Sequence, residues 1–412
     1  MNILFLSQIV PYPPHGGVLQ RGYNIIREIH KYNKVHLLAF IHPDVLKTER
    51  EVEDAKIELG KFCESVEFFP LWVKESKMNK YVGLLMGLFS TRPFSVHAHR
   101  SRSFQAKIVQ LLEKEKIDLI HYDTISLSQF VHADGNIPKV LTHHNIESKL
   151  MERRAKVEKN LFAKIYLSLQ TQRLRNYERG ESPKFAANIV MSDTDGEELK
   201  KIAGHIELAV APNGVDTEYF TPTQGNETLS LVYTGGMNMF ANKDAVLYFL
   251  NEIWPAIKAK EPNVEFYAIG QDPPPELVQI SQTDRQVIVT GYVDDIRPFV
   301  AKASVYVVPL RVGGGTRLKI LDAMAMGKAI VSTSIGCEGL SVEDGTNILM
   351  EDDPILLAAK TVDLLRNLEK RKKLGKAARM LVESEYAWPV IGETLQRVYE
   401  RAVTRPVLPS GG

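Results

Sequence analysis

The sequence predicts an α/β protein built from two parallel sheets. Short runs rich in β-branched and aromatic residues alternate with longer amphipathic stretches along most of the 412 residues. The strand runs are apolar throughout, which is typical of parallel strands covered by helices on both faces. The alternation stops near residues 211–226, among Pro, Gly and Asn, and then restarts. The chain therefore holds two α/β units of similar size.

The first unit opens with an apolar strand at Ile3–Leu6 and a helical pattern from Leu19 to His30. The same two patterns then recur up to residue 190. Further strands are expected at 35–40, 66–69, 119–122, 140–142 and 188–190, with a helix near 47–62.

Residues 149–184 depart from this rhythm, with ten basic and four acidic residues and several large apolar side chains. One interpretation is a basic amphipathic surface for anionic lipid. The other, which the sequence favours, is a long helix that packs on the first unit with its charges in solvent.

The second unit repeats the alternation. Strands are expected at 231–233, 264–269, 287–289, 305–308 and 329–331, with a helix over 243–260. A final helix over 390–403 follows Trp388-Pro389, and residues 408–412 are expected to be disordered or a scar of expression.

Composition excludes several classes of protein. Lys plus Arg (51) nearly balances Asp plus Glu (50), so no global charge favours nucleic acid. Two distant cysteines, Cys63 and Cys337, exclude a disulfide framework and a cysteine-based zinc site. The start of the chain lacks the features of a secretory signal, and no apolar run is long enough to span a membrane. These features predict a cytoplasmic protein.

The richest loop is the glycine run Gly313-Gly314-Gly315, which leads through Thr316 into a helical pattern that ends at Gly327. Thr316 is the expected N-cap. Arg317 and Lys319 then fall in the first turn, where the helix dipole disfavours cations unless an anion compensates. The loop therefore predicts a diphosphate site rather than a plain cap. Asp322, one turn on, is placed to accept hydrogen bonds from ribose hydroxyls.

Three more glycine loops follow predicted strands, where ligands of open α/β sheets bind. The first holds Gly16 and Gly17, and the second, in the other unit, holds Gly235, Gly236 and Asn238. The third, Gly291-Tyr292-Val293, either lines a base pocket or is an ordinary strand-to-helix turn. A plain turn would also use Gly16 and Gly17.

Two polar motifs also follow strands. His143 and His144 must point in opposite directions, so at most one faces a ligand. Asp193-Thr194-Asp195 has the spacing of a metal pair, but Asp195 with Glu198 is better explained as a helix cap. We expect no metal site.

Five stretches together point to a known family: Pro212-Asn213-Gly214-Val215-Asp216 with Phe220; Tyr233–Gly236 through 242–245; Thr290–Asp295; Pro309–Gly327; and Pro11–Gly17 with Arg21. This ordered set resembles the retaining GT-B glycosyltransferases of family 4 (group 1), of the bacterial polysaccharide-biosynthesis type. The resemblance covers nearly the whole chain.

The resemblance implies two Rossmann-like, doubly wound domains facing a cleft. Residues 1–210 would bind the acceptor, 211–225 would be the interdomain linker, and 226–387 would bind the nucleotide sugar. Residues 388–407 would form a helix crossing back onto the first domain. The resemblance implies no cofactor and no metal.

The sequence departs from the family pattern at two places in the donor-binding motifs. The family's E-x7-E motif would place acids at 314 and 322, where this chain has Gly314 and Asp322. The basic residues that usually follow the second domain's first strand are replaced by Met237 and Asn242. We therefore assign neutralisation of the diphosphate to Arg317 and Lys319.

The predicted activity is hexosyl transfer from a UDP- or GDP-type sugar to a saccharide or lipid-linked acceptor with retention of configuration, in cell-surface polysaccharide synthesis. Negative charge grows on the leaving diphosphate. It would be stabilised by Arg317, Lys319 and the backbone N–H groups of Gly16, Gly17, Gly235 and Gly315. A phosphate oxygen would take the acceptor's proton, and His144 would orient the sugar. The other donor contacts are assigned to Gly236, Asn238, Gly291, Tyr292, Val293, Gly314, Thr316, Leu318 and Asp322.

Two rival functions stay open: a nucleotide-sugar 2-epimerase on the same fold, and a non-catalytic sugar-binding protein. A dehydrogenase is disfavoured because no G-x-G-x-x-G follows the first strand. The expected partners are the donor and the acceptor, without nucleic acid. A lipid-linked acceptor would add a peripheral contact of 149–184 with the inner face of the plasma membrane.

Overall fold

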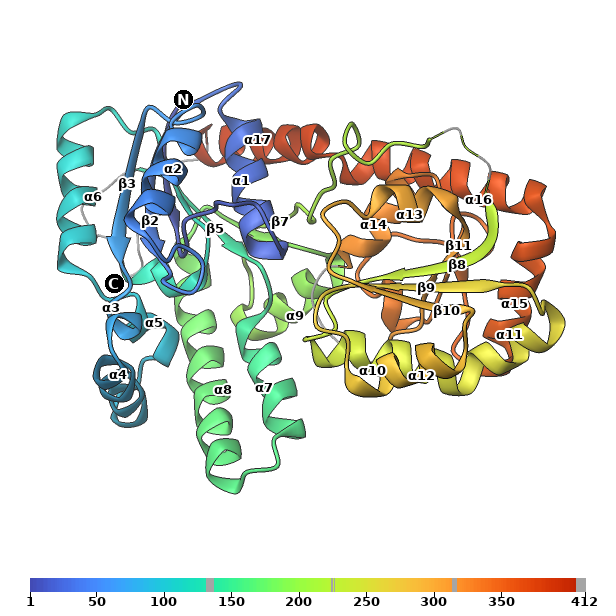
Figure 1. Cartoon of the computed structure of the whole chain (residues 1–412). Helices are drawn as coiled ribbons and strands as arrows, with labels where there is room; N and C mark the ends of the chain where they lie inside the picture. Colours follow the sequence, from blue (N-terminus) through green and yellow to red (C-terminus); the bar gives the residue numbers. More distant parts are fainter. Residues whose placement is uncertain (131–136, 224, 226, 313–316, 405–412) are drawn as a thin grey trace. The chain divides into compact units, whose positions relative to one another are not determined.

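The chain forms two compact units in a computed structural model that describes residues 1–130, 137–223, 225, 227–312 and 317–404 (Figure 1). Unit 1 consists of Met1–Pro212 and the chain from Ile391 onward, and unit 2 of Asn213–Val390. The boundary falls inside the predicted linker 211–225. Val215 is buried and pairs with Ala387, so the chain beyond Pro212 is already part of unit 2.

Unit 1 is built on a parallel sheet whose strand order is β3-β2-β1-β4-β5-β6-β7. The strands are β1 Asn2–Ser7, β2 Lys34–Ile41, β3 Ser65–Pro70, β4 Leu119–Tyr122, β5 Lys139–His143, β6 Ala187–Val190 and β7 Leu208–Val210. The order reverses between β1 and β4, which is the topological switch point where doubly wound sheets bind ligands. Every residue of β4 and β6 is buried, as their continuous apolar character predicts.

Helices cover both faces of this sheet (Figure 1). The helices of unit 1 are α1 Gly17–Ile29, α2 Glu49–Leu59, α3 Trp72–Glu75, α4 Lys77–Phe89, α5 Phe94–Ala98, α6 Arg102–Lys114, α7 Glu147–Val157, α8 Leu161–Glu181 and α9 Asp193–Ala203, with short 3₁₀ turns at Ile125–Phe130 and Ser182–Lys184. The prediction of one long helix over 149–184 is wrong. The Asn160 side chain caps α8 by accepting a hydrogen bond from the N–H of Ala163 at 3.0 Å, so the chain turns between α7 and α8.

The last helix, α17 (Trp388–Thr404), returns to unit 1 from Ile391 onward. The hydroxyl of its buried Tyr399 lies 2.6 Å from Nδ1 of His121 on β4. Gln396 accepts a hydrogen bond from Asn33 at 2.7 Å. At Gly392 a β-carbon would stand only 2.6 Å from Glu28 of α1, so the helices pack at the closest approach that glycine allows.

Unit 2 repeats the architecture with the order β10-β9-β8-β11-β12-β13, all parallel. Its strands are β8 Thr228–Thr234, β9 Glu265–Ile269, β10 Val287–Gly291, β11 Ala303–Val308, β12 Ile330–Ser332 and β13 Leu349–Met350. Its helices are α10 Phe240–Tyr248, α11 Trp254–Lys260, α12 Pro275–Thr283, α13 Arg297–Lys302, α14 Leu318–Ala325, α15 Pro354–Arg366 and α16 Leu368–Leu381, with a 3₁₀ turn at Ile335–Cys337 and a π-turn at Val382–Tyr386. The switch point lies between β8 and β11.

The predicted helix over 243–260 begins earlier and is interrupted. It starts at Phe240, and Phe249–Ile253 form a π-turn between α10 and α11. Pro255 stands at the start of α11 and has no N–H to donate, which accounts for the irregular turn before it.

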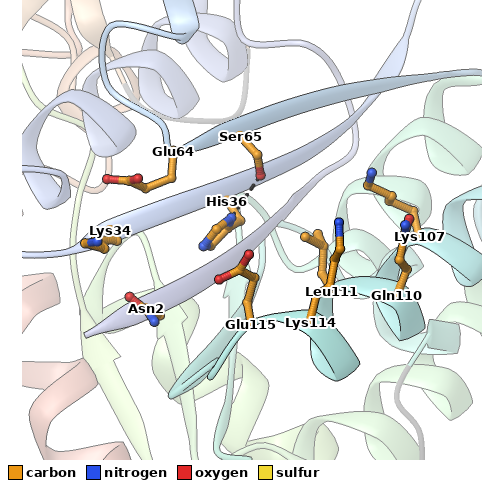
Figure 2. A pocket seen from close by; sticks show the side chains of 10 residues that line it. All are labelled: Asn2, Lys34, His36, Glu64, Ser65, Lys107, Gln110, Leu111, Lys114 and Glu115. Carbon is orange, nitrogen blue, oxygen red and sulfur yellow. Dashed lines mark hydrogen bonds between the residues drawn. The ribbon is translucent and has the colours of Figure 1, made fainter.

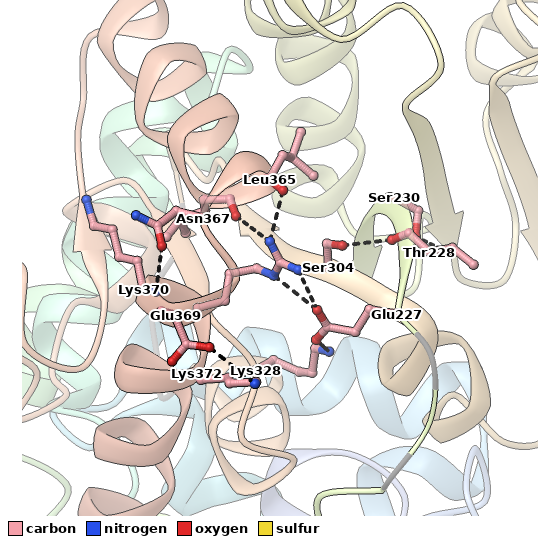
Figure 3. A network of polar contacts seen from close by, with 12 residues as sticks. Glu227, Thr228, Ser230, Ser304, Lys328, Leu365, Asn367, Glu369, Lys370 and Lys372 are labelled. Carbon is pink, nitrogen blue, oxygen red and sulfur yellow. Dashed lines mark hydrogen bonds and ion pairs between the residues drawn. The ribbon is translucent and has the colours of Figure 1, made fainter.

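A buried ion network joins the start of β8 to α16 in unit 2 (Figure 3). Glu227 pairs with Lys328 at 2.7 Å and with Arg371 at 2.9 Å. Both cations are nearly buried, at 7% and 10% side-chain exposure, whereas Glu227 keeps 28%. Burial lowers the pKa of Lys328, and Glu227 partly restores it.

Replacing Glu227 with alanine leaves two buried cations without their carboxylate. We expect the free energy of unfolding to fall by about 2 kcal/mol, less than for a fully buried pair because Glu227 is partly exposed. Urea unfolding measures it. Glu276→Ala, which removes an exposed pair with Lys243, should leave the midpoint unchanged. Equal midpoints for both variants would contradict a stabilising network.

Candidate functional site: a glycine-lined strand edge with a buried lysine

Three neighbouring strands of unit 2 end in glycine at the carboxyl edge of the sheet. Gly235, Gly270 and Gly291 follow or end β8, β9 and β10. A β-carbon on Gly270 would stand 1.9 Å from the carbonyl oxygen of Gly235, so only glycine permits this approach of the two loops. Backbone bonds from Gly235 N to Ile269 O (2.9 Å) and from Gly270 N to Gly291 O (3.0 Å) hold the loops together.

Lys319, in the first turn of α14, reaches this glycine edge. Its Nζ donates hydrogen bonds to the hydroxyl of Tyr233 (2.8 Å) and to Oδ1 of Asn242 (2.7 Å), and lies 4.2 Å from the centre of the Tyr233 ring. A β-carbon on Gly235 would lie 2.6 Å from Nζ. Asn242 also donates to the Gly236 carbonyl at 2.8 Å, which ties the lysine to the loop after β8.

The lysine is held by neutral groups. Among the described residues no carboxylate forms an ion pair with Lys319. Burial, with a smaller contribution from Arg317, lowers its pKa to about 7. Burial also raises the pKa of Asp322 to about 7. The Asp322 carboxylate accepts no hydrogen bond from the part of the chain that the structure describes, so it is available to a ligand hydroxyl.

Arg317, the second cation assigned to the diphosphate, has partners within unit 2. Its side chain is buried, its Nε donates to the carbonyl of Ile335 at 3.1 Å, and its guanidinium lies 3.5 Å from Glu338. Arg317 is also the N-cap residue of α14. The predicted N-cap, Thr316, lies outside the described residues, as do Gly314 and Gly315.

The remaining predicted donor residues differ in their exposure and in the bonds they make. Gly235 N–H is committed to Ile269, so the expectation that it stabilises the leaving group is wrong. Asn238 is exposed beside Gly236, where a β-carbon would meet its Oδ1 at 2.8 Å. Gly291 has φ +71°, Tyr292 is exposed, and both Val293 and Leu318 pack against the core.

In unit 1, Gly16 and Gly17 begin α1 after the loop that follows β1. Gly16 is the N-cap residue with φ +88°, and no side chain caps the helix. The first N–H groups of α1 are thus left to solvent or a ligand.

His144 and His143 diverge at the end of β5. His143 is buried against Asn188 at 3.0 Å, and burial lowers its pKa to about 4. His144 instead lies 3.1 Å from Oδ1 of the buried Asp123, at the carboxyl edge of the sheet. Since a carboxylate only accepts, Nε2 of His144 carries the hydrogen of this bond.

One residue of the edge in unit 1 was not predicted, and the structure also places Arg21 and Asp195. Asp123 directly follows β4 at the switch point, a position that should have marked it. Arg21 is fully buried and donates to the carbonyls of Ala211 (2.8 Å) and Pro212 (2.6 Å), so it anchors the end of unit 1. Asp195 was wrongly predicted as a cap: Ser192 caps α9 by accepting from Asp195 N at 3.2 Å.

A pocket in unit 1 lies at the opposite edge of the sheet (Figure 2). It is lined by Asn2, Lys34 and Ser65, which lie at the amino ends of β1, β2 and β3. Glu64 and Glu115 also line it, together with lysines. Ligands of doubly wound sheets bind at the carboxyl ends, so this pocket is separate from the site described above.

Both halves of the chain match glycosyltransferase families. Residues 16–219 match Glycosyltransferase Family 4, and residues 228–367 match Glycosyl transferases group 1.

Individual relatives agree with this. An uncharacterized 44.6 kDa protein in the cps region of Klebsiella pneumoniae is 21% identical over 93% of this chain and 96% of its own length. The phosphatidyl-myo-inositol mannosyltransferase of Mycobacterium tuberculosis is 26% identical over 53% of this chain and 60% of its own.

The fold is that of solved GT-B structures. Anabaena HepE in complex with UDP is 16% identical, with a TM-score of 0.66 over 97% of this chain and all of that chain. Sucrose-phosphate synthase from Thermosynechococcus elongatus has a TM-score of 0.65 over 97% of this chain and 99% of that chain, at 16% identity. The two Rossmann-like sheets and the matched families together show that the chain belongs to the GT-B glycosyltransferases, with a family 4 N-terminal half and a group 1 C-terminal half.

Proposed function

We propose that this enzyme transfers a hexosyl group from a nucleoside diphosphate sugar, with retention of configuration, and that Lys319 binds the diphosphate. The carrying observation is a desolvated ammonium at a glycine-lined strand edge, bonded to a phenol and an amide but to no carboxylate of the described chain. Burial disfavours this charge, and the attraction of Asp322 offsets the effect only in part, because the pKa of Lys319 still falls to about 7. An anionic ligand would favour the charged form.

In the proposed reaction the acceptor hydroxyl oxygen forms a bond to the anomeric carbon on the face from which the diphosphate leaves. The bond between that carbon and the diphosphate oxygen breaks, and the hydroxyl proton passes to a phosphate oxygen. Lys319 and Arg317 stabilise the growing negative charge, and Asp322 accepts from the ribose. The UDP in the HepE structure supports UDP as the first donor type to test.

Unit 1 is proposed to hold the acceptor, with His144 oriented toward the sugar by Asp123. The mannosyltransferase relative is named for a phosphatidyl-myo-inositol acceptor, which supports a lipid-linked acceptor here. The Klebsiella relative from a cps region supports a role in polysaccharide synthesis. We keep a cytoplasmic location and the membrane contact of 149–184 as parts of this proposal.

A panel of UDP- and GDP-sugars, read by released nucleotide and by analysis of the sugar, tests the function. Transfer to an added saccharide or lipid-linked acceptor with an unchanged anomeric centre is the expected result. Isomerised donor without transfer would instead identify an epimerase. A melting temperature that rises with donors, without turnover in the presence of any acceptor, would identify a sugar-binding protein.

The affinity for UDP should fall as the pH rises above 7. The free protein loses the Lys319 proton near pH 7, because burial has lowered that pKa. A bound diphosphate raises this pKa, so the complex keeps the proton that the free protein has lost. Between the two pKa values the dissociation constant should rise by roughly tenfold per pH unit. Calorimetric titration from pH 6.5 to 9 measures it.

The Lys319→Met variant is the control for this profile. It should bind UDP weakly and lose the steep rise that Lys319 contributes, which leaves only the smaller effect of Asp322, whose pKa also lies at about 7. A steep profile that survives in the variant would assign the titration to another group and remove Lys319 from the diphosphate site.

A further inference from the structure

Helix α4 of unit 1 turns its large apolar side chains outward. The exposed residues recur at helical spacing and form one stripe, which we call the apolar stripe of α4: Met78, Tyr81, Val82, Leu85, Leu88 and Phe89, between 42% and 82% exposed. A surface helix of a globular protein normally turns such a stripe to the core. An exposed contiguous apolar face indicates an interaction surface.

Glycines on the opposite face fix this orientation. A β-carbon on Gly83 would stand 2.9 Å from Val73, and one on Gly87 would stand 3.0 Å from the Tyr166 hydroxyl. Gln170 of α8 donates to the Gly87 carbonyl at 2.8 Å, and Arg173 donates to the Leu88 carbonyl at 2.7 Å. Rolling α4 would bring leucine or phenylalanine into spaces that hold only glycine, so the stripe stays outside.

A second group of exposed apolar side chains lies at the turn between α7 and α8, which we call the hairpin tip (residues 157–165). Its members, 58% to 83% exposed, are Val157, Leu161, Phe162 and Ile165. Tyr166, which meets Gly87 of α4, lies one turn beyond Phe162 on α8. Figure 1 shows α4 and the hairpin tip at the same end of unit 1.

Lysines flank both apolar groups. Lys77 and Lys80 are exposed on α4, and Lys159 and Lys164 are exposed at the hairpin tip. In the described ranges none of these four forms an ion pair, whereas the nearby Lys156 pairs with Glu152 at 3.1 Å. The acids on these segments are Glu75, Glu152 and Glu158. Positive charge therefore dominates the rim of the surface.

We propose that the apolar stripe of α4 and the hairpin tip form one docking surface for an anionic phospholipid bilayer. Apolar side chains would enter the boundary between head groups and acyl chains, while the flanking lysines pair with lipid phosphates. A second copy of the chain is the less favoured occupant, because two lysine-rimmed faces repel each other. No helix among the described residues is long and apolar enough to cross the bilayer, so the contact is peripheral.

This surface extends the membrane contact proposed above for 149–184 and rests on that part of the proposed function. It does not depend on the donor chemistry, so failure of its test and failure of sugar transfer are distinguishable. Flotation of the whole protein with phosphatidylglycerol vesicles should show binding that phosphatidylcholine vesicles do not match. Leu85→Glu and Phe162→Glu should each lower the partition coefficient by about tenfold or more. The matched control is Ile57→Glu, which places the same charge at an exposed apolar residue of α2, outside the proposed surface. This variant should bind the vesicles as the unchanged protein does.

Two further measurements separate insertion from adsorption. A tryptophan placed by Phe89→Trp should shift to shorter wavelength with anionic vesicles and be quenched by brominated acyl chains. Changing Lys77, Lys80, Lys159 and Lys164 together to glutamine should remove most of the salt-sensitive binding.

Several outcomes would overturn the proposal. Binding that Leu85→Glu and Phe162→Glu leave unchanged would place the lipid contact elsewhere. No vesicle binding, with a dimer in sedimentation that Leu85→Glu dissociates, would make the surface an interface between copies. Circular dichroism and nucleotide release with a water-soluble acceptor, both expected to be unchanged in Leu85→Glu, exclude misfolding as the cause of lost binding.

Discussion

Replacing Lys319 with methionine should lower the turnover number by about 10²–10³-fold, the usual effect of losing one preorganised group that stabilises developing charge. The fold should not suffer. Among the described residues the desolvated ammonium is bonded to Tyr233 and Asn242 and to no other group. Removing it should therefore leave the free energy of unfolding unchanged or higher. Released nucleotide measures the first effect and urea unfolding the second.

Arg317→Ala should also lower turnover, but with a different signature. Its guanidinium is bonded to Ile335 and lies near Glu338, so its removal should cost stability as well. The matched controls are Lys370→Ala and Arg366→Ala, at two exposed cations of unit 2, and both should retain full activity. Full activity in both Lys319→Met and Arg317→Ala would remove the diphosphate assignment.

Gly270→Ala should destabilise unit 2 severely and disturb the donor site. The added carbon would stand 1.9 Å from the Gly235 carbonyl oxygen, so the loop after β8 must move or the strand must shift. We expect a loss of about 3 kcal/mol in stability, as for severe overpacking, together with loss of UDP binding. Urea unfolding and calorimetric titration measure the two effects.

The control for this change is Gly180→Ala in α8, where a β-carbon meets no atom within 4 Å. That variant should be as stable as the unchanged protein or slightly more so. If Gly270→Ala binds UDP normally, the close approach of the two loops is not part of the donor site.

Much of the fold could be predicted because the hydrophobic period and the residue composition of a short segment indicate its secondary structure. Continuous apolar runs gave the positions of most strands, and the repeat of the pattern gave the two units. The break between α7 and α8 was missed because charge and apolar content continue across it, although Asn160 is a good N-cap. The π-turn before Pro255 was also missed, although this proline, which has no N–H to donate, is visible in the sequence.

In the candidate site, too, some residues could be identified from the sequence and others only from the structure. Lys319 was predicted because a cation in the first turn of a helix conflicts with the dipole, and that conflict is visible in the sequence. The partners of Arg317 were not predictable, since Ile335 and Glu338 approach it only through a tertiary turn. Gly270 was missed because a single glycine after a strand is common, and only its distance to Gly235 shows the constraint.

The return of the last helix to unit 1 has a consequence for how the chain matures on the ribosome. Unit 2 is one continuous stretch, so it has all of its residues as soon as it has emerged. Unit 1 waits for Tyr399 to cover His121, and that residue is translated after the whole of unit 2. Nascent unit 1 therefore carries an incomplete core until unit 2 and the helix after it have been translated.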